Sequence, residues 1–132
     1  FGPVRVCGPG LVAIGGPKHH GERNQPDPQM EALAQALAQW PGREAFPLVV
    51  VADDAEFCAQ ALDNFLWVAF TRSDPATDVY GANAARHWEC EAPLVIDARL
   101  KPFHAPPLEE DAAVIRKVEA LAAPGGPLHN YL

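Results

Sequence analysis

Short apolar runs alternate with longer amphipathic segments along the chain. Residues 3–7 (PVRVC) and 11–15 (LVAIG) are β-prone, and the Gly-Pro-Gly between them predicts a hairpin or a bent strand. Residues 47–51 (PLVVV) are apolar on both faces and β-branched, which favours a central, parallel strand. Residues 93–98 (PLVIDA) repeat this pattern and predict a second buried strand, and a short strand is expected to begin near Val79.

Three amphipathic segments have the spacing of helices. The apolar stripes expected to face the core are Met30, Leu33, Leu37 and Trp40 in the first, Leu62, Phe65, Leu66, Ala69 and Phe70 in the second, and Val114, Ile115, Val118, Leu121 and Ala122 in the third. Residues 15–28 are polar and rich in Gly and Pro, and they predict a loop. Strands that alternate with helices predict an α/β fold, a small mixed or parallel sheet flanked by helices.

Length and composition are those of one globular domain. The 132 residues, 48% of them hydrophobic, are enough for a single core spanning residues 1–132, with a strand, loop and helix lead-in over 1–46. The formal charge of −7 argues against nucleic acid and anionic membrane surfaces as partners. Without an apolar run of about 20 residues or a leader, the sequence predicts a cytoplasmic protein. Because Phe1 already lies in a strand-like pattern, we expect a piece of something longer.

The metal-ligating and nucleophilic residue types form no complete motif. Three widely spaced cysteines suit neither a disulfide framework nor a zinc site, and we expect reduced thiols at Cys7, Cys58 and Cys90. His19, His20 and Glu22 are possible ligands, but adjacent histidines in a polar segment are also typical of a solvated loop. His87 and Cys90 are one helical turn apart, which allows either a metal or thiolate–imidazole pair or simple packing beside Trp88.

Two aspartates follow the central strand. Asp53 and Asp54, together with Asp97 and Lys101, resemble the acids and lysine of a phospho-acceptor receiver site, in which acids hold Mg²⁺ and Asp97 would take the phosphoryl group. In receivers, however, the lysine follows a further strand, whereas Lys101 lies only four residues after Asp97. The alternative is that the two acids cap a helix or the turn before it.

From Pro47 onward the sequence resembles the C-terminal domain of the UbiD-like decarboxylases. Three segments carry the resemblance, in the order and spacing of that family: LVVVADDAEF, LDNFLWVAFTRSDPATDV and APLVIDARLKP. Val68 stands where many members have alanine. The matched positions, which the resemblance implies to be structural, are Asp53, Asp54, Trp67, Arg72, Asp74, Asp78, Asp97 and Lys101.

The resemblance implies a division of labour within a larger enzyme. The family's catalytic residues and its ligands for prenylated FMN and a divalent metal lie in a preceding domain, so no catalytic, cofactor or metal residue is expected in this chain. Residues 47–132 would form the C-terminal region that packs against the remainder of the decarboxylase and forms a homo-oligomer, with Arg72 and Asp74 locking a helix end to the following turn. The alternative hypotheses are a stand-alone assembly subunit that docks through the segment PFHAPPLEE, and a receiver-like phospho-switch.

Overall fold

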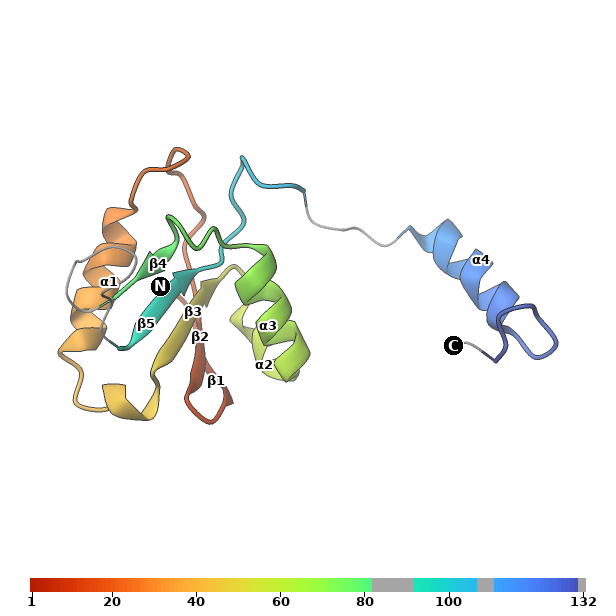
Figure 1. Cartoon of the computed structure of the whole chain (residues 1–132), viewed down its shortest axis with the longest axis horizontal. Coiled ribbons are helices and arrows are strands. Elements are labelled where there is room, and N and C mark those ends of the chain that lie inside the picture. Colours follow the sequence, from red (N-terminus) through yellow and green to blue (C-terminus); the bar gives the residue numbers. More distant parts are fainter. Residues whose placement is uncertain (82–91, 107–110, 131–132) are drawn as a thin grey trace.

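The computed structural model describes residues 1–81, 92–106 and 111–130. Five strands in these ranges form one mixed sheet with the order β1-β2-β3-β5-β4 (Figure 1). Their bounds are β1 Val4–Gly8, β2 Leu11–Gly15, β3 Leu48–Ala52, β4 Val79–Tyr80 and β5 Leu94–Asp97.

The three inner strands run parallel and the two edge strands run antiparallel to them. β3 pairs with β2 in the register Val12↔Val49 and with β5 in the register Val49↔Val95. β1 and β2 form the expected hairpin, and β4 pairs with β5 through Val79↔Ile96. The central, parallel position predicted for residues 47–51 is confirmed.

Four α-helices in the described ranges accompany the sheet. They are α1 Pro28–Ala38, α2 Ala55–Gln60, α3 Leu62–Thr71 and α4 Ala112–Ala122, and a short 3₁₀ turn spans Arg43–Ala45. α1 lies on one face of the sheet, whereas α2 and α3 lie on the other (Figure 1). The α/β prediction is confirmed.

The core consists of two layers because alternate residues of β3 point to opposite faces. Val49 and Val51 pack in the cluster that contains Met30 and Ala34 of α1. Val50 and Ala52 pack with residues of α2 and α3, including Phe65. These four residues therefore pack alternately in the two core layers.

The apolar stripe predicted for the second helical segment is only partly correct. The chain breaks at Ala61, whose φ of −155° and ψ of 153° are extended, and α2 and α3 are thereby separate helices. Phe65, Val68 and Ala69 are the buried residues of α3. Leu62, Leu66 and Phe70 are exposed instead, together with Trp67, because the sheet meets only one side of the helix.

The other two helices are confirmed, with different burial from that expected. In α1 Met30 and Ala34 are buried, whereas Trp40 lies beyond the helix end, is exposed and stacks on Phe46. α4 has no buried residue, and in Figure 1 it stands apart from the sheet. The apolar stripe of α4 therefore has no partner among the described residues. Within the same ranges, none of the helices has both the length and the apolar character needed to cross a membrane.

Candidate functional site

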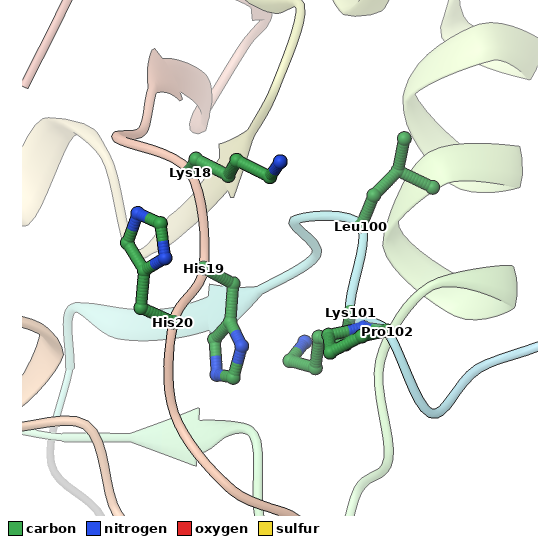
Figure 2. Close-up of a pocket in the computed structure, with 6 residues that line it drawn as sticks. All are labelled: Lys18, His19, His20, Leu100, Lys101 and Pro102. Carbon is green, nitrogen blue, oxygen red and sulfur yellow. The ribbon is translucent and has the colours of Figure 1, made fainter.

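Charged residues gather at the edge of the sheet where the three parallel strands end. This edge is where ligands collect in open α/β sheets. Residues 16–27 follow β2, the Asp53-Asp54 pair follows β3, and residues 98–104 follow β5. A cavity of about 530 Å³ opens here, and Figure 2 shows its lining residues Lys18, His19, His20, Leu100, Lys101 and Pro102.

Arg99 is the centre of a buried ion-pair network. Its Nε donates to Asp97 Oδ1 at 2.8 Å and its Nη2 to Asp97 Oδ2 at 2.8 Å, which is the planar two-bond geometry that a guanidinium and a carboxylate share. Nη2 also donates to Asp27 Oδ2 at 2.5 Å, and Nη1 donates to the Pro17 carbonyl at 3.1 Å. The side chains of Arg99 and Asp97 are each 1% exposed. Arg99 thereby joins β5 to the loop after β2.

Two features of the sequence allow the Arg99 side chain to reach Asp27 and Asp97. Asp27 is the N-cap of α1, where its Oδ1 accepts from Gln29 N at 2.8 Å, so its other oxygen is free to face Arg99. A Cβ on Gly16 would lie 2.6 Å from both Arg99 Cδ and Val51 Cγ1. Only glycine at position 16 leaves room for the arginine stem to reach the two carboxylates.

Lys101 forms the second part of the network. Its Nζ lies 3.1 Å from Asp78 Oδ2 and 3.8 Å from Asp97 Oδ1, and it donates to the Asp97 carbonyl at 2.7 Å. Asp78 Oδ2 also accepts from Asp74 N at 2.7 Å. Lys101 therefore ties the turn between α3 and β4 to the end of β5.

The network shifts the pKa of two of its members, Asp27 and Arg99. Burial acts to raise the pKa of Asp27, but the hydrogen bonds from Arg99 and from the Gln29 amide outweigh it, and the pKa lies below its ordinary value. Burial acts to lower the pKa of Arg99, and the hydrogen bonds to Asp97 and Asp27 more than reverse this effect. Both groups are therefore charged at neutral pH.

The Asp53-Asp54 pair has the helix-capping role that was one of the two alternatives. Asp54 is the N-cap of α2 and accepts from Phe57 N at 2.9 Å. Asp53 Oδ2 accepts from Leu100 N at 2.7 Å, so this acid fastens the segment after β5. With Asp97 held by Arg99 and buried, the acids do not form an accessible phospho-acceptor site.

Arg72 has a different partner from the one expected. Its Nη1 lies 3.9 Å from Asp53 Oδ2, and its guanidinium carbon lies 5.1 Å from the centre of the Trp67 ring. Asp74 instead accepts from Ala76 N at 2.9 Å and organises its own turn. Among the described residues no Arg72–Asp74 ion pair is present, and Arg72 lies beside the acid after β3 instead.

The sequence did not identify every member of the site. Arg99 and Asp27 were missed, although Asp27 directly precedes Pro28 at a helix start, an N-cap signal that was available. The KHHGER segment was expected to be a solvated loop, and His20 and Glu22 are exposed, but His19 is buried. The His87–Cys90 pair lies outside the described residues. Cys7 and Cys58 are free thiols, as predicted.

Three side chains at this edge have the chemistry of metal ligands. One ring nitrogen of His19 and one oxygen each of Asp27 and Asp97 lie within 4.8 Å of one another. Among the described residues, the acids of the site, Asp27, Asp53, Asp78 and Asp97, each have a basic side chain or a backbone amide as a partner. The arrangement therefore resembles a set of structural ion pairs and hydrogen bonds more than an acid–base catalytic centre.

Comparison with known proteins gives partial similarities. The chain is 32% identical over 87 residues to a 4-hydroxybenzoate decarboxylase subunit of Chlamydia pneumoniae, and 33% identical over 86 residues to an uncharacterised protein of Chlamydia caviae. These matches cover 64% and 63% of this chain but only 15% of each relative. The chain therefore corresponds to a small part of the relatives it matches. No protein-family model matches it.

Proposed function

We propose that this chain is the C-terminal structural and assembly part of a UbiD-like decarboxylase and has no catalytic activity alone. The observation that supports this most is the partial similarity to a protein of the 4-hydroxybenzoate decarboxylase type, which covers 87 residues of this chain and 15% of the relative. The segments LVVVADDAEF, LDNFLWVAFTRSDPATDV and APLVIDARLKP supply β3, α3 and β5, the elements around the network.

The site supports a structural role over a chemical one. Decarboxylation and its reverse need protein groups that take up and release protons. Within the described residues, Asp27, Asp78 and Asp97 are held by Arg99 or Lys101 and do not fit such a relay. Prenylated FMN and a divalent metal would belong to the remainder of the enzyme, where the flavin-derived cofactor supplies an electron sink.

Two exposed apolar surfaces favour assembly as the contribution of this part. On α3 the exposed residues are Leu62, Leu66, Trp67 and Phe70, and on α4 they are Val114, Ile115, Val118 and Leu121. A helix with an apolar stripe obtains most of its stability from packing that stripe against another surface. We infer that α4 packs on a second copy of the chain or on the remainder of the enzyme.

The first test is to read the native gene upstream of the Phe1 codon in frame. A reading frame that continues for some hundreds of residues and encodes the acid-and-arginine set of a flavin-dependent decarboxylase supports the proposal. A start codon within a few residues contradicts it and favours the alternative, a stand-alone assembly subunit, for which the exposed apolar stripe of α4 is the supporting observation. Release of CO₂ from an aromatic acid by the isolated chain with added cofactor would contradict the absence of catalysis.

Assembly is tested by sedimentation velocity on the chain and two variants. Val118→Lys places a charge in the apolar stripe of α4, whereas Glu119→Lys changes charge on the polar side of the same helix. If α4 mediates association, the wild type and Glu119→Lys sediment as oligomers at micromolar concentration and Val118→Lys sediments as a monomer. A wild-type chain that remains monomeric at about 100 μM would refute self-association.

A further inference from the structure

His19 is a buried imidazole with an unused nitrogen. The residue is 6% exposed, and its Nδ1 is buried without a hydrogen-bond partner among the described residues. The other ring edge faces Gly21, whose added Cβ would lie 3.1 Å from Cε1 and Nε2. Buried polar nitrogens in folded proteins are almost always paired, so the position calls for an occupant.

Two acids of the network lie beside His19. The network described above contains three acids, Asp27, Asp78 and Asp97, and two bases, Arg99 and Lys101. Two of these acids, Asp27 and Asp97, each offer an oxygen within 4.8 Å of a His19 ring nitrogen. A cation held between them would use a His19 ring nitrogen and one oxygen of each acid.

We propose that His19, Asp27 and Asp97 bind a divalent transition-metal ion of the Zn²⁺ class. One imidazole and two carboxylates are a donor set that Zn²⁺ accepts, with water in the fourth position. The cavity lined by His19 and Lys101 gives that water access to the site. The proposal depends on these residues alone and not on the assignment to a decarboxylase.

The existing hydrogen bonds are compatible with coordination. A carboxylate has about four lone-pair positions. Asp27 uses one for the Gln29 amide and one for Arg99. Asp97 uses three, all for donors of Arg99. Each acid therefore retains a lone pair, and Arg99 holds both carboxylates in orientation, as outer-shell partners do at metal sites.

The geometry requires a small contraction. Ligand atoms at about 2.0–2.1 Å from a tetrahedral Zn²⁺ lie about 3.4 Å apart, whereas the three atoms here lie within 4.8 Å of one another. A rotation of the His19 ring can supply this movement while the hydrogen bonds of Asp27 to Gln29 and Arg99 stay in place. The nearby charges of Arg99 and Lys101 weaken the attraction, so we expect a dissociation constant in the micromolar range.

A proton or a water molecule at the unused nitrogen of His19 would give different results from a metal ion. A proton on His19 would also add positive charge, but burial lowers the pKa of this imidazole and opposes protonation at neutral pH. An ordered water could donate to Nδ1, and in that case added Zn²⁺ would not bind at this position. Metal titration therefore separates the proposed ion from both alternatives.

The experiment is calorimetric titration of the full chain with Zn²⁺ at pH 7. We expect one ion per chain and at least a tenfold weaker dissociation constant in His19→Ala and in Asp27→Asn. Asn is as good an N-cap as Asp, so Asp27→Asn retains the start of α1. His20→Ala removes the adjacent, exposed imidazole and should leave the affinity within about twofold.

A second readout needs no variant and covers the case in which His19→Ala does not fold. In the wild-type chain labelled with ¹⁵N-histidine, Zn²⁺ should move a His19 ring-nitrogen resonance while those of His20, His87, His104 and His129 remain in place. Absence of binding at 1 mM Zn²⁺, shifts confined to the other histidines, or equal losses in His19→Ala and His20→Ala would each overturn the proposal.

Discussion

Replacing Arg99 by methionine tests whether the buried network holds the carboxyl edge of the sheet together. Methionine keeps an unbranched side chain and removes the charge and the donor groups. Arg99→Met deletes the bonds of 2.8 Å to each oxygen of Asp97, the bond of 2.5 Å to Asp27 and the bond of 3.1 Å to the Pro17 carbonyl. Asp97, 1% exposed, is then left with Lys101 at 3.8 Å as its nearest basic side chain in the described part of the chain.

Arg99→Met is expected to lose a large share of the free energy of unfolding. Breaking a buried ion pair by removing one partner costs about 3–5 kcal/mol, because the remaining charge stays buried without compensation. Domains of this size have a free energy of unfolding of about 5–15 kcal/mol. A loss of about 4 kcal/mol lowers the melting temperature by about 10–20 °C. Arg99→Lys retains the charge without the planar fork, so its loss should be intermediate.

Urea denaturation at pH 7 measures these differences. The matched control is Arg43→Met, because Arg43 is exposed, and its free energy of unfolding should stay within about 0.5 kcal/mol of the wild type. If Arg99→Met unfolds within about 1 kcal/mol of the wild type with an unchanged denaturant slope, Arg99 does not stabilise this edge and the reasoning is refuted.

Two further predictions concern the core face formed by α2 and α3. Phe65 is fully buried, so Phe65→Ala should destabilise the chain by about 3–5 kcal/mol. Phe70 is 70% exposed, so Phe70→Ala should cost less than about 1 kcal/mol. Comparable losses of the two variants in urea denaturation would contradict the assigned helix face. Burial raises the pKa of the Cys58 thiol to about 11 from an ordinary value of 9.0, so Cys58 stabilises the fold below pH 9 and this contribution is lost as the pH rises toward 11. Unfolding measured between pH 8 and 11 should show a smaller alkaline loss in Cys58→Ala, and identical slopes would argue against the buried thiol.

Sequence patterns predicted the sheet better than the helix faces. The runs at 47–51 and 93–98 are β-branched and apolar on both sides, a composition that suits buried parallel strands, and both became inner strands. In α3 the apolar residues surround most of the helix, so periodicity could not tell Phe65 and Val68, which meet the sheet, from Leu66 and Phe70, which do not. Exposed apolar residues and buried apolar residues of α3 therefore have the same sequence pattern.

From the sequence, only the site residues at or just after the end of a predicted strand could be identified. Asp97, the last residue of β5, and Lys101, four residues later, were identified because they stand at the end of an obvious strand. Arg99 stands between them, but its partner Asp27 lies 72 residues earlier, and no local pattern reports such a contact. The breaker-rich composition of residues 15–28 correctly predicted a loop, yet it could not show that this loop packs over Arg99 with His19 inside.

The two bases after β5, Arg99 and Lys101, connect the end of this strand to other segments of the chain. Arg99 fastens the loop after β2 and the start of α1, and Lys101 fastens the turn before β4. Asp53 in turn holds the backbone between these two bases through Leu100 N. Buried ion pairs are often no more stabilising than well-packed apolar residues of similar volume, so stability alone is a weak reason for this construction. Its distinctive property is directional, because the bonds connect three loops from different parts of the chain in one arrangement.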